Sequence, residues 1–244
     1  MLRDGSTPTV RRPRNDPAQY DDLLDEWWAP RGAFAMLHWI AAARARLVPP
    51  ATHPAAVLVD IACGGGLMGP YVGSLGYRHV GLDLSHGSLR LAAGHGITPM
   101  RADAHRLPLA DESADVVVAG EVLEHVRDAD TVLAEAVRVL RPGGTLVLDT
   151  LADTWWARTI SITVAEALPG GPPRGLHDGD LYVDRSRLVR RCADLGVDLT
   201  LSGLRPSVRD CVRWLARRRP DVRMVPTWTT AVLFQGHGVK AGPR

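Results

Sequence analysis

The feature that most constrains the fold is a short apolar strand that runs directly into glycines. Residues 57–61 read Val-Leu-Val-Asp-Ile, and Gly64, Gly65 and Gly66 follow after two residues. Because glycine has no Cβ, the backbone N–H groups of such a loop can approach a ligand closely, and a helix after the loop adds the positive end of its dipole. The pattern predicts a strand, a ligand-binding loop and a helix that reaches Leu75.

Strands and helices continue to alternate beyond this loop. Ser85 and Asp128 are placed to cap two of the helices, and the turn at 141–144 stops the second one. This order predicts an α/β fold of the Rossmann-like, doubly wound type, with a mainly parallel, seven-stranded sheet and right-handed crossovers. The expected strands are residues 57–61, 79–83, 97–101, 114–119 and 145–149, with 197–202 and 228–235 in an antiparallel C-terminal addition.

The charge balance and the cysteines exclude several classes of protein. With 29 Lys and Arg against 27 Asp and Glu, the net charge of +2 gives no field that would concentrate nucleic acid. The three cysteines lack CxxC spacing, so they indicate neither a disulfide framework nor a zinc site. No apolar run approaches the roughly 20 residues that span a bilayer, and the N-terminus lacks the apolar core of a signal peptide. We expect a soluble, cytoplasmic protein.

The glycine loop alone leaves the ligand open. Residues 64–69 also satisfy the GxGxxG pattern of dinucleotide-binding folds, and Asp83 lies near the spacing of the acid that binds a ribose there. A nicotinamide cofactor is therefore one interpretation. Whichever ligand is bound, Gly64 and Gly66 mark its site, and we expect both to bind the cofactor.

Three acids favour a different ligand. Asp60, Asp83 and Asp103 stand at the carboxyl ends of three successive strands, which line one crevice in a parallel sheet. Asp60 can face an amino group, Asp83 suits the two hydroxyls of a ribose, and Asp103 can accept from an adenine amino group. This set fits a cationic nucleoside amino acid, S-adenosylmethionine. The alternative is structural, with Asp60 and Asp103 capping turns.

These residues resemble the class I methyltransferases and, within them, the ubiquinone-biosynthesis O-methyltransferases. The resemblance covers about residues 20–203, and its most specific parts are the pair Trp27-Trp28 and the string Glu121-Val-Leu-Glu-His-Val126. The other matching segments are residues 60–66, 81–85, 103–108, 141–144 and 175–178.

The resemblance implies how the cofactor is held. Gly64 and Asp83 would lie in the cofactor site, Gly120 would line it, and Arg44 would grip the cofactor's carboxylate, as a guanidinium can do bidentately. A solvated helix arginine is the alternative for Arg44. The sequence departs from the family at Ala62, where the family has glycine, and beyond residue 203.

A phenolic acceptor must lose a proton during methyl transfer, so it needs a base or a metal. Glu121, Glu124 and His125 follow the fourth strand at positions i, i+3 and i+4, and would share one face of a helical turn. The resemblance implies a divalent metal such as Mg²⁺ at all three. The second interpretation makes His125 a general base oriented by Glu121 or Glu124. The third is a capping and salt-bridging cluster with no catalytic role.

The remaining chain carries candidate surfaces for the acceptor. His177 and Asp178 follow a Pro-Gly segment and form either a pocket lip or a surface loop. Residues 154–168 carry two tryptophans and few charges, so they predict a packed lid or a peripheral contact with the inner membrane face. The segment 205–223 holds seven arginines, either as a solvated face or as a surface for anions.

We expect one methyltransferase domain at residues 19–244 after a disordered lead-in at residues 1–18. Within the domain, residues 19–50 form a helical cap, 55–150 the cofactor-binding core, and 151–244 the acceptor side. The predicted function is S-adenosylmethionine-dependent O-methylation of a small hydroxylated aromatic, such as a polyprenyl catechol or quinol. The alternatives are O-, N- or C-methylation in secondary metabolism and a non-catalytic, cofactor-binding regulatory protein.

Overall fold

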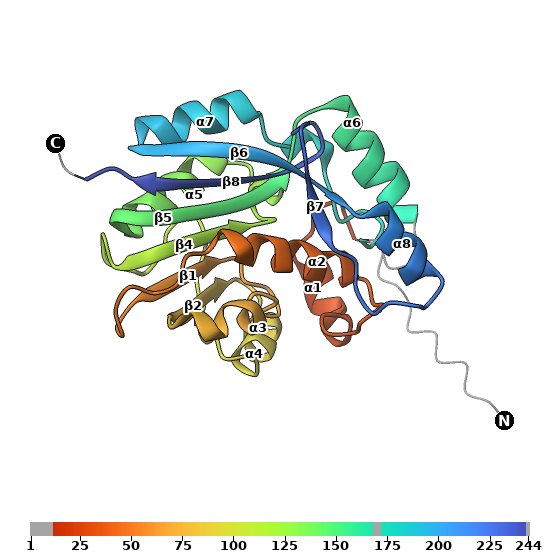
Figure 1. Cartoon of the computed structure of the whole chain (residues 1–244), viewed down its shortest axis with the longest axis horizontal. Helices are drawn as coiled ribbons and strands as arrows, with labels where there is room; N and C mark the ends of the chain where they lie inside the picture. Colours follow the sequence, from red (N-terminus) through yellow and green to blue (C-terminus); the bar gives the residue numbers. More distant parts are fainter. Residues whose placement is uncertain (1–11, 168–171, 243–244) are drawn as a thin grey trace.

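The computed structural model describes residues 12–167 and 172–242, and its centre is a mixed sheet of strand order β3-β2-β1-β4-β5-β8-β6-β7 (Figure 1). The first five strands run parallel, and the last three are antiparallel to their neighbours. The bounds are β1 (Val57–Ile61), β2 (Arg78–Asp83), β3 (Thr98–Arg101), β4 (Ala114–Gly120), β5 (Leu140–Leu151), β6 (Val197–Pro206), β7 (Met224–Thr227) and β8 (Leu233–Lys240).

The mainly parallel, doubly wound sheet is confirmed, but it has eight strands where the sequence predicted seven. The additional strand is β7, a four-residue edge strand that contains Pro226. A proline lacks the N–H that a sheet ladder uses, so it is tolerated at an edge and removes the usual strand pattern from the sequence. The last strand also begins later than predicted, at Leu233, which leaves Trp228 outside it.

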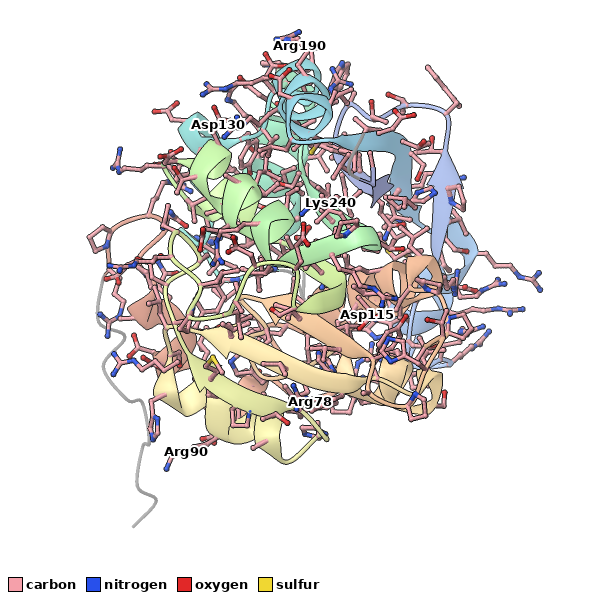
Figure 2. All side chains as sticks on the ribbon, turned by 90° about the vertical axis from the view of Figure 1, so that its left-hand side faces the viewer. Arg78, Arg90, Asp115, Asp130, Arg190 and Lys240 are labelled. Atoms are coloured by element: carbon pink, nitrogen blue, oxygen red, sulfur yellow. The ribbon has the colours of Figure 1, made fainter. Side chains whose placement is uncertain are left out.

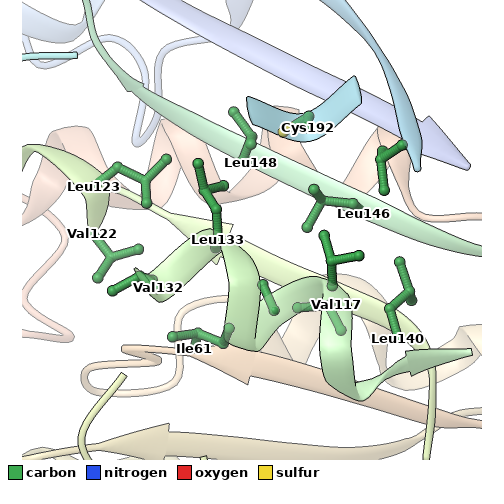
Figure 3. Packing of buried hydrophobic residues seen from close by; sticks show 14 of the residues in the cluster. Ile61, Val117, Val122, Leu123, Val132, Leu133, Leu140, Leu146, Leu148 and Cys192 are labelled. Carbon is green, nitrogen blue, oxygen red and sulfur yellow. The ribbon is translucent and has the colours of Figure 1, made fainter. Parts of the chain in front are cut away.

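Helices cover both faces of the sheet because alternate residues of its strands point to opposite sides. Val117 and Leu146 belong to the core under α5 (Ala129–Val139), which is shown close up in Figure 3. Their neighbours Val116 and Val147 belong to the core on the other side, under α2 (Ala35–Arg44). Helices α4 (His86–Ala93) and α7 (Arg185–Asp194) complete the layers.

The two predicted helix caps, Ser85 and Asp128, form, and Asp184 caps a third helix. Side-chain oxygens of Ser85, Asp128 and Asp184 each accept a hydrogen bond from a backbone N–H in the first turn of α4, α5 and α7. Such caps satisfy donors that have no partner within the helix.

The helical segment after the glycine loop ends at Leu75 as predicted, but only its first four residues are α-helical. It comprises α3 (Gly69–Val72) and a 3₁₀ turn at Gly73–Leu75. Gly64 and Gly66 have φ values of 53° and 83°, which a right-handed helix cannot accommodate, so the chain turns several times before the helix begins. The backbone of the loop, and not the N-terminus of a long helix, therefore faces the crevice.

The N-terminal cap and the C-terminal part flank the carboxyl ends of the strands. The cap contains α1 (Ala18–Asp22), α2 and 3₁₀ turns at Leu24–Glu26 and Ala45–Leu47. The expected single helix at residues 155–168 is instead α6 (Trp155–Arg158), a π-helical turn (Thr159–Val164) and a 3₁₀ turn (Ala165–Ala167); residue 168 lies outside the described residues. A 3₁₀ turn (Gly179–Leu181) and α8 (Val208–Leu215) complete the described helices.

Charged side chains of both signs lie on the side of the molecule remote from α6 and α8 (Figure 2). Asp115 accepts from the backbone N–H of Val57 at 2.7 Å and pairs with Arg141. Lys240 donates to the carbonyls of Val137 and Leu140, which ties the end of β8 to the last turn of α5 and the start of β5. Within the described ranges, no helix combines the length and the apolar character needed to cross a bilayer.

Candidate functional site

A cavity of about 860 Å³ opens at the carboxyl ends of β1, β2 and β4, beneath the N-terminal cap. The sheet order reverses between β1 and β4, and open α/β sheets bind ligands at such a point. Charged groups line one end of the cavity. The walls elsewhere are mainly apolar.

The structure brings the three predicted acids to the charged end of this cavity. Asp60 is buried, with one carboxylate oxygen 3.3 Å from Nε2 of His79. Asp83 accepts from the backbone N–H groups of Gly64 and Ser85 at 2.9 and 2.8 Å. Burial raises the pKa of Asp83 above its usual value.

Asp103 is the most exposed of the three acids. It accepts from the backbone N–H of His105 at 2.9 Å, and this bond lowers the pKa of Asp103. It therefore caps the following turn, as the structural interpretation required, and it also lines the cavity. The two interpretations are compatible because only one of its carboxylate oxygens, Oδ1, accepts these bonds.

At Gly64 and Gly66, a side chain would collide with different parts of the structure. A Cβ on Gly64 would lie 2.3 Å from the ring of Trp27, so the glycine admits the indole over the loop. A Cβ on Gly66 would lie 2.7 Å from Cα of Ala92 in α4, and Gly66 does not line the cavity. Gly64 belongs to the candidate site, whereas Gly66 packs the loop against a helix.

Arg44 is buried in the cavity wall and forms a bidentate pair with Asp149 at the end of β5. The distances are 2.6 Å from Nε and 2.8 Å from Nη2. Burial alone would lower the pKa of Arg44, but the charge and hydrogen bonds of Asp149, together with the charges of Asp60 and Glu121, outweigh this effect and raise it. A Cβ on Gly120 would lie 1.8 Å from Cζ of Arg44, so Gly120 makes room for the guanidinium. Nη1 takes no part in the pair with Asp149.

Glu121, Glu124 and His125 follow β4, the last two in a 3₁₀ turn at Leu123–His125. Glu121 and His125 line the cavity, but Glu124 is fully buried behind it and accepts from Thr150 Oγ1 at 2.7 Å. Burial raises the pKa of Glu124 to about 7. Burial, and next the proximity of Glu124, raises the pKa of Glu121 well above its usual value.

His125 is oriented by residues that the sequence did not single out. Its Nδ1 lies 2.6 Å from Oδ1 of Asn15, and its Nε2 lies 3.4 Å from the hydroxyl of Tyr20. Burial, with a smaller contribution from His177, lowers the pKa of His125 to about 3. Neither Glu121 nor Glu124 forms the predicted orienting contact to the ring.

The side chains of the three predicted metal ligands do not converge on a common site. Within residues 12–167 and 172–242, no three His, Cys, Asp or Glu side chains are grouped as the ligands of one ion would be. One oxygen of Glu121 and one of Glu124 are nevertheless buried without a hydrogen-bond partner.

The cavity extends from the charged end into an apolar arm. Its lining comes from α2, the end of β5, the π-helical turn, β6 and α8, and includes Ile40, Leu151, Ile160, Leu204 and Val208. His177 is buried in the cavity wall, where its ring stacks on that of His125, whereas Asp178 caps the 3₁₀ turn at Gly179–Leu181.

The sequence did not identify Asp149 and Asn15 as residues of the site. It also did not show that Trp27 covers the glycine loop. Asp149 and Asn15 meet partners 105 and 110 positions away, which no local spacing reveals. Asp149 carried one available signal, since it stands at the carboxyl end of a predicted strand like the other three acids.

A family model described as a methyltransferase domain matches residues 59–148. The ubiquinone biosynthesis O-methyltransferase of Parvibaculum lavamentivorans is 31% identical over 201 residues, which cover 75% of this chain and 79% of the relative. The enzyme of the same name from Methylococcus capsulatus is 35% identical over 181 residues, covering 71% and 76%.

Solved structures share the fold at low sequence identity. A possible histamine N-methyltransferase from Thermotoga maritima aligns with a TM-score of 0.61 at 17% identity, over 91% of this chain and 96% of that one. Magnesium protoporphyrin IX methyltransferase from Synechocystis aligns with a TM-score of 0.59 at 16% identity, over 92% and 97%. These likenesses concern the architecture alone.

Proposed function

Because the chain belongs to the family of ubiquinone biosynthesis O-methyltransferases, we propose that it methylates a hydroxyl group on an aromatic ring that carries a long apolar chain. The enzyme is an S-adenosylmethionine-dependent O-methyltransferase. The observation that carries the acceptor proposal is the cavity, which continues from the three acids into an arm lined by apolar side chains. A polyprenyl catechol or quinol has the matching division into a polar ring and a greasy chain.

The cofactor would occupy the charged end of the cavity. Asp60 would receive its amino group, Asp83 its ribose hydroxyls and Asp103 its adenine amino group, with Gly64 and Gly120 as the close backbone walls. The free Nη1 of Arg44 would bind the carboxylate. Gly66 would contribute by packing the loop and not by contact.

Methyl transfer then needs an acceptor oxygen in line with the sulfonium methyl group. The S–CH₃ bond breaks as the O–CH₃ bond forms, and S-adenosylhomocysteine leaves. Holding the two reactants in this geometry supplies much of the rate. The acceptor's phenolic proton would pass to the unprotonated Nε2 of His125, a residue that lines the cavity as Glu121 does. Because burial lowers the pKa of His125 to about 3, the imidazole is a weak base, and it would take the proton only as the O–CH₃ bond forms and makes the phenolic O–H strongly acidic.

The experiment for this proposal is turnover of labelled cofactor with a set of catechols that differ only in the apolar chain. A prenylated catechol should give a product heavier by one CH₂ and a lower KM than the same ring without a chain. His125→Ala should lose most of kcat with the prenylated substrate. Equal kcat/KM for chained and unchained catechols would contradict the role of the apolar arm, and methylation confined to amines would point to a different acceptor class.

A divalent ion such as Mg²⁺ at Glu121, Glu124 and His125 is the second candidate for activating the acceptor. The two buried carboxylate oxygens without a partner favour it. When bound, such an ion would stabilise the phenolate of the acceptor. The contacts to Thr150 and Asn15 would have to be released for the three side chains to meet, so the mechanism above uses no ion.

Metal removal separates these two candidates. If the base mechanism holds, enzyme treated with EDTA and then dialysed keeps its activity while His125→Ala loses it. If the ion is required, the treated enzyme is inactive, Mg²⁺ restores it, and calorimetry detects Mn²⁺ binding that Glu121→Gln abolishes.

Two elements next to residues that line the acceptor arm carry exposed apolar side chains. Trp155 and Trp156 of α6 are 65% and 58% exposed, and Val212 of α8 is 60% exposed. Arg209 and Arg213 lie exposed on the same short helix α8. We propose a peripheral contact between this face, residues 154–167 with α8, and an anionic membrane surface, from which an acceptor with a long apolar chain would enter the arm.

Co-sedimentation with vesicles tests this contact. Binding to vesicles that contain phosphatidylglycerol should exceed binding to neutral vesicles and should fall in Arg209→Glu/Arg213→Glu. The matched control is Arg90→Glu/Arg190→Glu, on the remote side seen in Figure 2, which changes the net charge equally and should bind normally. If both double variants lost vesicle binding equally, the binding would depend on net charge alone. That result would contradict a defined membrane-binding face.

A further inference from the structure

Asn15 touches His125 at two points, although the two residues stand 110 positions apart. Its Nδ2 donates to the backbone carbonyl of His125 at 2.9 Å, and its Oδ1 lies 2.6 Å from Nδ1 of the ring. One amide group thus holds both the backbone and the side chain of the same residue.

These two contacts determine the tautomer of His125. A carbonyl oxygen only accepts, so the amide must present its NH₂ group to it, and the opposite orientation would set two acceptors against each other. Oδ1 therefore faces the ring, and since Oδ1 also only accepts, Nδ1 must carry the hydrogen. In the neutral ring, the lone pair is then on Nε2, toward the hydroxyl of Tyr20 and the cavity.

The segment that carries Asn15 is fixed over the cavity by further hydrogen bonds. The backbone N–H of Asn15 donates to the carbonyl of Gly175 at 3.0 Å, and Arg14 donates to the carbonyl of His177 at 2.9 Å. Gln19 also reaches the carbonyl of Gly175. Residues 12–18, which the sequence assigned to a disordered lead-in, thus connect the turn after β4 with the loop before residue 178.

The backbone of Asn15 suits this position as well as its side chain. Its φ of 57° lies in the left-handed region, which asparagine tolerates better than most residues. A short amide in this conformation presents both of its polar atoms to His125, which a longer side chain at the same place would not do.

We propose that Asn15 is a positioning residue, which locks His125 in the Nδ1–H tautomer and aims its Nε2 lone pair into the reaction cavity. Enzymes use a hydrogen-bond partner on one ring nitrogen in this way to set the function of the other, whether the imidazole serves as a base or as a metal ligand. The tautomer assignment stands on geometry alone, and its value for catalysis rests on the proposed function of His125.

The test reads the tautomer of His125 directly, by long-range ¹H–¹⁵N correlation in protein labelled at histidine, with His125→Gln to identify the signals. Wild-type enzyme and Asn15→Asp, which keeps an acceptor for Nδ1–H, should show the Nδ1–H form. Asn15→Ala should shift the ring toward the Nε2–H form that histidine favours in water. Gln19→Ala is the matched control, because it removes a contact of the same segment without touching His125, and should keep the wild-type tautomer.

Activity supplies the second readout. Asn15→Ala should lower kcat about 10- to 100-fold, as loss of such a partner does elsewhere, with the Kd for S-adenosylmethionine within about twofold of wild type. Asn15→Asp restores the acceptor for Nδ1–H but sets a carboxylate oxygen against the carbonyl of His125, so it should recover part of kcat. An unchanged tautomer in Asn15→Ala, or an equal shift in Gln19→Ala, would overturn the positioning role. If Asn15→Ala shifted the tautomer but kept its kcat, Asn15 would still be the residue that determines the tautomer, but the proposed function of His125 would be refuted.

Discussion

At the scale of single residues, Ala62 is where this chain pays a conformational cost. Its φ of 55° lies in the left-handed region, where a Cβ is unfavourable and glycine is not. This accounts physically for the glycine of the resembling family at that position. The sequence identified the departure, but only the backbone angle explains it.

Ala62→Gly should therefore stabilise the protein, by about 0.5–1 kcal/mol in the free energy of unfolding measured with urea. The control is Ala134→Gly in α5, where the backbone is helical and glycine should destabilise by a similar amount. Destabilisation by both changes would show that contacts of the Ala62 methyl group outweigh its backbone strain.

At Gly120, in contrast to Ala62, an added methyl group should be harmful, because it would displace a charged side chain. In Gly120→Ala the new Cβ would lie 1.8 Å from Cζ of Arg44, so the guanidinium must leave its place beside Asp149. We expect at least about a tenfold weaker Kd for S-adenosylmethionine by calorimetry, corresponding to the loss of about 1.4 kcal/mol. The companion change Gly73→Ala meets no atom within 4 Å and should bind normally. Unaltered binding in Gly120→Ala would remove Arg44 from the cofactor site.

At the scale of elements, local chemistry in the sequence predicted more than long-range contact did. Ser85 and Asp128 predicted the starts of two helices correctly, because a cap acts on residues within its own turn. The length of α3 and the π-helical turn after α6 were not predictable, since the first depends on positive φ values in the loop and the second on packing. The short edge strand β7 was missed because a proline interrupts its pattern.

Helix α8 offers an element whose stability should depend on pH. Its Asp210 is buried and accepts from Nε of Arg223 at 2.6 Å, with Arg219 also nearby, and these partners lower the pKa of Asp210. A carboxyl with a lowered pKa in the folded state stabilises the fold above its unfolded pKa, and this contribution disappears as the pH falls through the folded pKa.

Asp210→Asn should accordingly lower the melting temperature at neutral pH, and the difference from wild type should narrow below about pH 4. Scanning calorimetry across this range measures it. A difference that is constant with pH would mean that the shape of Asp210, and not its charge, holds α8.

At the scale of the whole molecule, the fold class and the crevice were predictable because strand order and helix alternation determine both. The sequence placed Asp60, Asp83 and Asp103 at neighbouring strand ends, and in the structure they line one cavity. What the sequence did not provide is the cover of that cavity. Trp27, Tyr20 and Asn15 approach it from the N-terminal part of the chain, through contacts that depend on the completed sheet.

Cofactor binding should stabilise the molecule as a unit. A ligand at 100 times its Kd adds about 2.7 kcal/mol, so S-adenosylmethionine should raise the melting temperature by roughly 5–10 °C. NAD should have no effect, although the loop matches GxGxxG. Asp83→Asn should reduce the shift. If NAD raised the melting temperature by a similar amount, this result would favour the interpretation of the loop as a dinucleotide-binding site.

The pair of Arg44 and Asp149 also bears on how fast the enzyme can exchange its spent nucleoside. An unpaired arginine would hold the carboxylate that S-adenosylmethionine and S-adenosylhomocysteine have in common, and so retain the inhibitory product. Asp149 already neutralises most of that charge before any ligand arrives. In the proposed cofactor site, this pairing would weaken the attraction between Arg44 and the carboxylate, so S-adenosylhomocysteine would leave faster than from an unpaired arginine.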